Sequence, residues 1–376
     1  MAKIKKNKEK NYYYFRESLG YDAYGKRCHP YKSGFKTKGE AEIYQAKLRI
    51  AFAEGTYVKA SKTTFLEFIK EWFEFYRRNV EKTTAQNRWP LIKNHIVPYF
   101  EGKRLDKITP RMLDDFYSKK LGEGLSGKTV RELHNLLNRA FSQAVKWSYL
   151  QNNPVANATP PRVVKKEMVV WDEGELKRFL RLIESRDDYA LYLLLITTGM
   201  RKGELLGLKW CDVDFDKGKL HIRRSLCRVN GEGLVLKNPK TTQSNRQISI
   251  SSYVRDVLRK HYEKQQKVIK AYQGHFNLEE LVFCNSKGTF KDPNNLLREF
   301  NHIIKTASLP KVTIHNLRHL HATLMLKNGE NPKVVSERLG HSRIGITMDT
   351  YSHVVPDIQD AAALRFEEAY LSKQGA

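Results

Sequence analysis

Cysteine is scarce in this sequence, and the few cysteines present are not arranged to hold a metal or a disulfide framework. Four occur in 376 residues, at Cys28, Cys211, Cys227 and Cys284. No two of them form a C-x-x-C pair, which argues against a zinc site and against a disulfide-stabilised secreted fold. We therefore expect a protein of the reducing cytoplasm, with no metal.

Long apolar segments are also missing. The chain starts with a charged stretch, Met1 to Lys10, with no apolar region behind it, so no signal peptide is predicted. The longest strongly apolar run, Tyr189 to Ile196, is far too short to span a bilayer. We expect no membrane association.

Acidic residues are few relative to basic ones. Lys and Arg total 67 against 41 Asp and Glu, which gives a net charge of +26, and the sequence pI is about 9.7. Such an excess predicts a polyanionic partner. By composition alone, a ribosome-associated or membrane-surface protein fits as well as a DNA-binding protein.

The length predicts two or three domains, and residues 1–60 have the composition of the first. Basic and aromatic residues alternate there, and glycines separate short strand-like pieces. Thr37 and Glu40 form a helix-start signal. We predict a small three-stranded sheet with one helix. Its candidate DNA contacts are Lys5, Lys6, Tyr13, Arg16 and Arg27.

Residues 63–160 read as a helical domain. A capping box at Thr64 and Glu67 precedes apolar residues at helical spacing. Three further helices are predicted, at Gln86–Phe100, Thr109–Leu121 and from Ser126 onward. The proline-rich stretch Asn152–Arg162 is predicted to be a linker.

A P-loop pattern occurs at Gly122–Thr129 but is not expected to bind nucleotide. A P-loop follows a buried strand, whereas the residues before Gly122 have the pattern of an amphipathic helix. We interpret the segment as a turn between helices, with Ser126 as the N-cap. Lys128 and Arg131, at the start of the following helix, are candidate DNA contacts.

Residues 166–376 are predicted to form a mixed, mainly helical domain. Asp172 and Glu175 cap its first helix, and a buried helix follows at Tyr189–Thr198. Strand-like segments lie around Lys219–Cys227, Gly233–Leu236 and Gln247–Ile250. A C-terminal helix with a partly apolar face is predicted at Asp357–Ser372.

Four motifs in this third segment carry the chemistry. They are Thr198-Gly-Met-Arg201-Lys-Gly-Glu204, Lys240 between strand-like pieces, His315-Asn-Leu-Arg318-His319, and Leu339-Gly-His341 with Tyr351 ten residues later. Each has an ordinary reading by itself, as a surface cation or a half-buried aromatic. His315 and His319, at i and i+4, could suggest a metal, but the metalloprotease pattern has Glu where Asn316 stands. Together, in this order, they are specific.

With these motifs, nearly the whole chain resembles the tyrosine recombinases, specifically the lambda-type integrases of temperate phages and conjugative transposons. The resemblance implies an arm-type DNA-binding domain, a helical SAM-like core-binding domain and a catalytic domain. It also implies double-stranded DNA with core and arm sites, a homotetramer on DNA, and accessory DNA-bending or excision factors. The implied reaction integrates or excises a mobile element through a 3′-phosphotyrosine, a free 5′-hydroxyl and a four-way junction.

The residues suit that reaction. Two guanidiniums, Arg201 and Arg318, can hold the phosphate oxygens on which charge develops. His315 and His341 can donate to the same phosphate or move protons, and Lys240 can protonate the leaving oxygen. Tyr351 supplies the nucleophile. Glu204, three residues after Arg201, can orient it. Because the covalent bond stores the energy of the cut, no ATP, metal or other cofactor is expected.

Other classes fit less well. A non-catalytic DNA-binding protein would share the charge but lack the joined motifs. Recombinases that resolve chromosome dimers resemble shorter, two-domain enzymes, which lack a segment such as residues 1–60 of this chain. A type IB topoisomerase shares the chemistry but resembles this motif order less.

Overall fold

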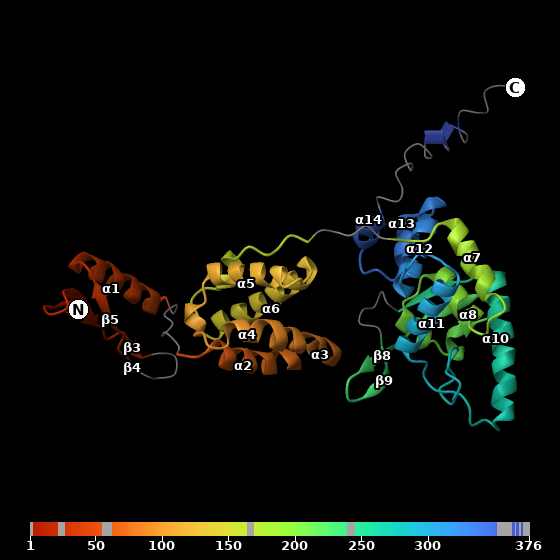
Figure 1. Cartoon of the computed structure of the whole chain (residues 1–376), viewed down its shortest axis with the longest axis horizontal. Helices are drawn as coiled ribbons and strands as arrows, with labels where there is room; N and C mark the ends of the chain where they lie inside the picture. The colour runs from red at the N-terminus through yellow and green to blue at the C-terminus, as the bar shows by residue number, and fades with distance from the viewer. Residues whose placement is uncertain are drawn as a thin grey trace. The chain divides into compact units, whose positions relative to one another are not determined.

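A computed structural model describes residues 3–21, 27–54, 62–163, 169–238 and 245–351, with residues 363, 364, 366, 367 and 370 near the end. Lys240 lies outside these residues, as does most of the helix predicted at Asp357–Ser372. The chain divides into two compact units, Met1–Lys165 and Lys166–Ala376 (Figure 1). Each unit is described below by itself.

The first unit begins with a small sheet and one helix, as predicted. Strands β1, β2 and β5 form an antiparallel sheet in the order β1-β2-β5, and a two-stranded ribbon, β3-β4, was not predicted. The elements are β1 (Lys5–Asn7), β2 (Tyr12–Arg16), β3 (Gly20–Tyr21), β4 (Arg27–Cys28), β5 (Tyr31–Phe35) and α1 (Lys38–Ala53). The predicted capping box at Thr37 and Glu40 starts α1.

The two faces of this sheet differ because side chains alternate along a strand. Phe15 is 1% exposed and stacks on Phe35, and both rings contact Tyr44 of α1. On the other face, Tyr14 contacts Tyr12 and Tyr31. One face thus forms the core with α1, and the opposite face presents tyrosines.

The helical part of the first unit follows the predicted order, with one changed boundary. Its elements are α2 (Phe65–Arg78), α3 (Lys82–Leu91), a π-helical segment (Ile92–Ile96), α4 (Val97–Phe100), α5 (Pro110–Gly122) and α6 (Gly127–Lys146), with a 3₁₀ turn at Leu105–Lys107. The second predicted helix therefore begins at Lys82, four residues before Gln86. Pro90 lies inside α3 and has no N–H to donate, and the π-helical segment follows it directly.

The predicted linker at Asn152–Arg162 is wrong in its first half. Pro154–Asn157 forms a 3₁₀ turn in which Val155 is fully buried and packs into the core of the helical domain. The Asn153 amide donates to the Asn138 side chain at 2.7 Å, which ties the turn to α6. Prolines suggested a free connection, but burial of an apolar side chain holds this segment on the domain.

The second unit is mainly helical, with a three-stranded sheet in the order β10-β7-β6 and a β8-β9 hairpin. Its helices are α7 (Glu173–Ile183), α8 (Tyr189–Thr198), α9 (Lys202–Leu206), α10 (Ser252–Ala271), α11 (Pro293–Thr306), α12 (Ile314–Lys327), α13 (Pro332–Leu339) and α14 (Ile344–Tyr351). Its strands are β6 (Val213–Asp214), β7 (Lys219–Ile222), β8 (Ser225–Val229), β9 (Gly233–Lys237) and β10 (Arg246–Ser249), and a 3₁₀ turn spans Trp210–Asp212.

The strand-like segment Lys219–Cys227 is two strands rather than one. β7 pairs with β6 and β10, whereas β8 pairs with β9. The chain changes sheet between them at Arg223 and Arg224, and Arg224 donates to the buried Asp212 carboxylate at 2.6 Å. Leu220, Ile222 and Leu226 keep one two-residue phase across the break, and Arg224 at the intervening position was the one sign that a continuous strand was interrupted.

Helix α8 forms the centre of the second unit, among α10, α11 and α12 (Figure 1). It is apolar on every side, and eight of its ten residues are buried. Its last residue is followed by the motif that contains Arg201. A fully enclosed helix therefore fixes the position of the segment that carries the first predicted catalytic arginine.

Candidate active site and nucleic-acid interface

The turn between α8 and α9 requires a glycine at its first position. Gly199 ends α8 with φ at +64°, a left-handed conformation that favours glycine. A Cβ there would lie 2.6 Å from His321 Cδ2 and 2.7 Å from Leu339 Cδ2. Close packing against α12 and α13 thus places Arg201 immediately after the turn, next to residues from both helices.

Glu204 connects two arginines from different elements. Its carboxylate accepts from the Arg201 backbone N–H at 2.9 Å and from Arg201 Nη1 at 2.8 Å. It also accepts from Arg246 Nη2 at 2.9 Å and Nη1 at 3.2 Å. Burial opposes the ionised form, but Arg246 and Arg201 outweigh it and hold the pKa of Glu204 below its usual value. The predicted contact between Glu204 and Arg201 is present, and Arg246 is an addition.

Arg318 is a buried cation, and only part of its guanidinium is hydrogen-bonded to described residues. It lies on α12, is 3% exposed, and donates from Nη1 to the Gly199 carbonyl at 2.9 Å. Its Nη2 has no hydrogen-bond partner among the described residues. Burial, followed by the charge of Arg201, lowers the pKa of Arg318. A buried guanidinium N–H without an acceptor is costly, and an anionic oxygen at this position would offset that cost.

Three histidines surround the arginine pair. His315 and His319 lie one turn apart on α12, with ring centroids 4.7 Å apart. His341 follows α13 and bonds through Nδ1 to the buried Thr347 hydroxyl at 2.8 Å. Burial first, then neighbouring cations, lowers the pKa of His315 and brings that of His341 to about 4. These rings are therefore neutral at neutral pH.

Tyr351 ends α14 and points into this cluster. Its side chain is 1% exposed, and its hydroxyl lies 2.6 Å from His319 Nδ1. Burial raises the pKa of Tyr351 to about 12, against the opposing pull of Arg318. The ten residues from His341 to Tyr351 thus include the short helix α14, which places the phenol next to the histidines.

Five of the six predicted catalytic residues lie in this region of the second unit. They are Arg201, His315, Arg318, His341 and Tyr351, and Lys240 lies outside the described residues. Two residues in the cluster, Arg246 and His319, were not predicted to act. His319 stood in a quoted motif, but its contact with Tyr351 joins positions 32 residues apart and cannot be read from local spacing.

The P-loop pattern at Gly122–Thr129 has the predicted structural role. α5 precedes it, Ser126 caps α6 by accepting from the Thr129 N–H at 3.2 Å, and Gly127 is the first residue of α6. A helix–turn–helix in place of a strand–loop–helix removes the geometry that binds a nucleotide phosphate.

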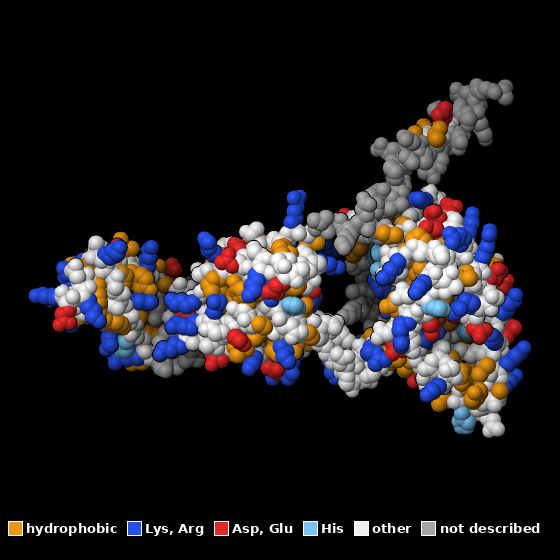
Figure 2. Space-filling view, in the orientation of Figure 1, with side chains coloured by type: hydrophobic (Ala, Val, Ile, Leu, Met, Phe, Trp, Pro, Cys, Tyr) orange, Lys and Arg blue, Asp and Glu red, His pale blue; other side chains and the backbone are white. Residues whose placement is uncertain are grey.

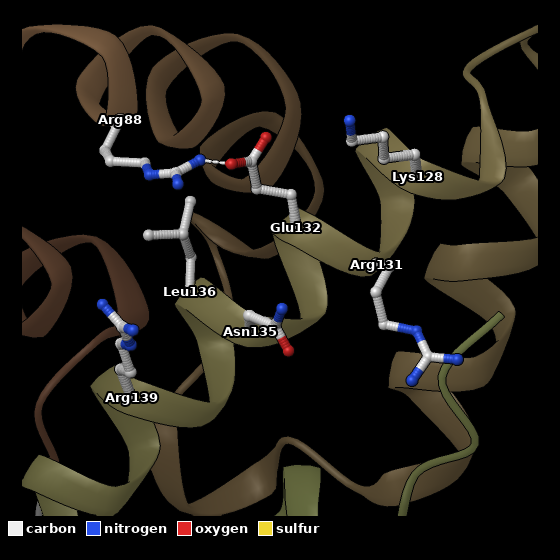
Figure 3. Close-up of a pocket in the computed structure, with 7 residues that line it drawn as sticks. All are labelled: Arg88, Lys128, Arg131, Glu132, Asn135, Leu136 and Arg139. Atoms are coloured by element: carbon white, nitrogen blue, oxygen red, sulfur yellow. Dashed lines mark ion pairs between the residues drawn. The ribbon is translucent and has the colours of Figure 1, made fainter. Parts of the chain in front are cut away.

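The first turns of α6 carry a basic hollow on the surface of the helical domain (Figure 3). The pocket has a volume of about 250 Å³ and is lined by Arg88, Lys128, Arg131, Glu132, Asn135, Leu136 and Arg139. Arg88 forms an ion pair with Glu132, and Arg131 donates to the Pro161 carbonyl at 2.6 Å. Lys128 and Arg139 are exposed and have no ion pair with another described residue. Their free cations suit a polyanion.

The predicted contacts in the first segment lie on β1, β2 and β4. Lys6 lies over the Tyr13 ring, Arg16 over Tyr31 and Arg27 over Tyr21, each with its charged group about 6 Å from the ring centroid. Lys5 pairs in register with Tyr14.

The tyrosines divide between the two sheet faces. Tyr13 lies on the same face as Phe15, where α1 packs, and is half-buried. Tyr14 and Tyr31, which were not predicted as contacts, lie on the open face with Arg16. Strand alternation around Phe15 was the signal that could have identified them.

Charge on the rest of the molecule follows the composition. Lys and Arg side chains are spread over the visible surface of both units, with Asp and Glu fewer among them (Figure 2). No group of three or more His, Cys, Asp or Glu side chains is placed to hold a metal ion in the described part of the chain. Among its described helices, none is long and apolar enough to cross a membrane.

Comparisons with known proteins identify the family of the chain. Family models match residues 170–357 (phage integrase family), 64–121 (phage integrase, N-terminal SAM-like domain) and 3–50 (arm DNA-binding domain). A tyrosine recombinase XerC-like protein of Caldanaerobacter subterraneus is 32% identical over 366 residues, covering 92% of this chain and 93% of its own. The ICEBs1 integrase of Bacillus subtilis is 29% identical over 336 residues, covering 88% of this chain and 90% of its own.

Solved structures share the fold. The Tn1549 transposon integrase bound to a circular-intermediate DNA superposes with a TM-score of 0.69 at 23% identity, covering 81% of this chain and 99% of that one. A lambda integrase tetramer on a Holliday junction superposes with a TM-score of 0.58 at 18% identity, covering 93% and 94%. The chain belongs to the phage integrase family of tyrosine recombinases. The predicted family, three-domain fold class and activity as a DNA-binding, site-specific recombinase of mobile elements are confirmed.

Proposed function

We propose that the buried arginine–histidine–tyrosine cluster cuts and rejoins DNA through a 3′-phosphotyrosine at Tyr351. Arg201 and Arg318 bind the non-bridging oxygens of the scissile phosphate. His315 and His341 donate hydrogen bonds to the same phosphate. Lys240 protonates the leaving 5′ oxygen, and Glu204 positions Arg201. The observation that carries this assignment is the Tyr351 hydroxyl, buried within the same cluster as Arg318 and its uncommitted Nη2.

The charges fit a phosphodiester under attack. The Glu204 carboxylate neutralises only one of the three guanidiniums of Arg201, Arg246 and Arg318, so the cluster keeps an excess positive charge of two. A phosphodiester carries one negative charge, and attack by the phenol builds a second on its oxygens. Fixed cations placed where charge develops stabilise that state by several kcal/mol. No metal ion is required to supply the same charge.

We assign the DNA contacts to the three domains at residues 1–60, 63–160 and 166–376. The first binds arm-type sites through Lys5, Lys6, Arg16 and Arg27 together with Tyr14 of the open sheet face, whereas Tyr13, also predicted as a contact, lies on the face toward α1 and contributes less. The second binds the core site through Lys128 and Arg131. Because Arg131 is held by Pro161, its charge is positioned before DNA arrives. The working assembly is a homotetramer on DNA, in a bacterial cytoplasm, that resolves a Holliday junction. DNA-bending or excision factors assist it.

The test uses a nicked duplex that carries an end of the protein's own element. Incubation with the wild-type chain in excess EDTA and without ATP is expected to give a covalent protein–DNA adduct on a denaturing gel. Tyr351→Phe is expected to bind the duplex with nearly the same affinity and to form no adduct. An adduct in Tyr351→Phe rules out this nucleophile, and cleavage that needs added Mg²⁺ rules out the metal-free mechanism.

A further inference from the structure

The hydroxyl of Tyr351 has one side-chain partner in the described structure, and that partner is none of the six residues assigned above. It is His319, whose Nδ1 lies 2.6 Å from the phenol oxygen, with the two ring centroids 5.7 Å apart. A distance of 2.6 Å is at the short end of hydrogen bonds to a hydroxyl. The contact joins the reacting atom of Tyr351 directly to a group that can take a proton.

We propose that His319 accepts the proton of the Tyr351 hydroxyl as that oxygen attacks the scissile phosphate. This role rests on Tyr351 being the nucleophile, as proposed above. In the step, the phenol oxygen–phosphorus bond forms and the phosphorus–O5′ bond breaks. The phenol proton moves to His319 Nδ1, and the O5′ leaving group takes a proton from the general acid. On rejoining, the imidazolium returns its proton to the phenol oxygen.

The protonation state of His319 allows this ring to accept a hydrogen bond. Burial first, then the charges of His315 and Arg318, lowers the pKa of His319 to about 4. The ring is therefore neutral at pH 7, and one of its nitrogens is an acceptor. In the tautomer that the proposed step uses, the hydrogen is on Nε2 and Nδ1 accepts the O–H of Tyr351.

The groups around His319 explain how a ring with so low a pKa can accept the proton of Tyr351. His315 and Arg318 face His319 from its own helix, Tyr351 faces it from α14, and His341 lies close enough to be influenced by it. A bound phosphodiester would place negative charge against Arg318 and cancel part of the repulsion that opposes protonation of His319. Bond formation to phosphorus acidifies the phenol at the same moment, so the proton moves only as attack proceeds.

The geometry also assigns His315 and His341 a role different from that of His319. His341 Nδ1 is engaged by Thr347, and His315 has its ring edge-on to His319 rather than against the phenol. In the described part of the chain, neither ring forms a hydrogen bond with the Tyr351 hydroxyl, whereas His319 does. In this proposal His315 and His341 contact the phosphate, and His319 accepts the proton.

Two substitutions of His319 separate proton acceptance from simple positioning. In His319→Asn the amide oxygen occupies about the place of Nδ1 and can accept the hydrogen bond but cannot take the proton. His319→Phe removes both properties and keeps a ring of similar size. The control is His302→Asn, at an exposed histidine of α11. DNA binding by gel shift shows that each variant is folded.

The measurement is the single-turnover rate of adduct formation on a nicked duplex with a 5′-bridging phosphorothiolate. Because sulfur leaves without a proton, the general acid is bypassed and a slow rate reports the phenol side of the reaction. We expect both His319 variants to be about 10²- to 10⁴-fold slower than wild type. The deficit should shrink about tenfold for each unit of pH from 7 to 9.5, since a phenol without a base must ionise by itself.

Each alternative outcome is decisive. If His319→Asn reacts at the wild-type rate while His319→Phe is slow, the residue only positions Tyr351. A pH-independent deficit also contradicts proton acceptance, and wild-type rates in both variants remove any role. The Tyr351→Phe chain in the same assay separates the role of Tyr351 from that of His319. An adduct in that variant shows that Tyr351 is not the nucleophile. Its absence, together with wild-type rates in both His319 variants, shows that Tyr351 is the nucleophile and that His319 does not take its proton.

Discussion

Cations in the two units of this recombinase are held in opposite ways. In the second unit, Arg318 is buried against a carbonyl, and Arg246 is buried against the Glu204 carboxylate. In the first unit, Lys128 and Arg139 extend from an exposed face of α6 without an ion pair in the described structure. The contrast teaches that chemistry needs charge fixed before the substrate arrives, whereas affinity for a polyanion needs only charge at the surface.

The largest effect is expected where a fixed guanidinium is replaced by a flexible ammonium. Arg318→Lys keeps the charge but loses the planar group that donates to the Gly199 carbonyl and that, in the proposed mechanism, also binds the phosphate. We expect adduct formation to slow by about 10²- to 10³-fold, with DNA affinity little changed. Single-turnover cleavage of a nicked duplex measures this, and Arg298→Lys on the exposed side of α11 is the control. Equal rates in the two variants would remove the distinction between fixed and surface cations.

A second variant tests whether Glu204 is what fixes the charge. Glu204→Gln leaves Arg201 and Arg246 facing each other without a carboxylate. We expect a loss of about 3 kcal/mol in the free energy of unfolding and about tenfold slower cleavage. Glu279→Gln, at an exposed ion pair with Lys209, should change stability by well under 1 kcal/mol. Thermal melting of both variants measures the difference, and similar melting temperatures would contradict a structural role for the buried carboxylate.

Because Glu204 is the group concerned, we also expect the stability of the fold to depend on pH. The pKa of Glu204 is lowered in the folded state, so its contribution to stability is complete above the unfolded value of about 4.3. That contribution is lost as pH falls through the lower folded value. The melting temperature of the wild type should therefore exceed that of Glu204→Gln at pH 6, and the difference should shrink below about pH 4. A constant difference down to pH 3 would show that Glu204 is not ionised in the fold.

Replacement of the exposed cations of α6 should weaken DNA binding rather than slow cleavage, and the effects should be smaller than those of the buried residues. Lys128→Ala and Arg139→Ala are each expected to weaken core-site binding and to make the slope of log affinity against log salt shallower by about 0.9. At saturating protein, cleavage should be unchanged. Lys128→Arg, which keeps the charge, is the matched control and should retain the wild-type slope. Unchanged salt dependence in both alanine variants would show that this hollow does not contact phosphates.

The smallest effect on chemistry is expected from the first domain. Removal of residues 1–60 should abolish binding to distal arm-type DNA and leave core-site binding and cleavage of a nicked core duplex intact. Within the domain, Tyr14→Ala, on the open sheet face, should weaken arm binding more than Tyr13→Ala, on the face that packs against α1. Equal arm binding by the truncated and full chains would contradict the assignment.

Sequence patterns predicted this fold well where the determinants are local. The capping boxes at Thr37, Thr64 and Asp172 start helices as expected, and apolar spacing marked α8 as buried. Errors arose where distant contacts decide. Val155 anchors a proline-rich stretch to the helical core. The chain changes sheet between β7 and β8 because β7 pairs with the distant β10, whereas β8 pairs with the adjacent β9.

The candidate site divides in the same way. Arg201 and Glu204 are three residues apart, so their contact was predictable from helical spacing. Arg246 meets Glu204 across 42 residues, and His319 meets Tyr351 across 32. Each of these two residues looks like an ordinary neighbour of a motif in the sequence. Only the packing of β10 and α14 against the cluster shows what they contact.

The residue that becomes joined to DNA can be identified on the protein itself. The adduct formed on a nicked duplex would be digested with nuclease and protease, and the peptide carrying the nucleotide identified by mass spectrometry. We expect one modified peptide, with the 3′-phosphate of the nucleotide on the Tyr351 oxygen. A nucleotide attached to any other residue would contradict it.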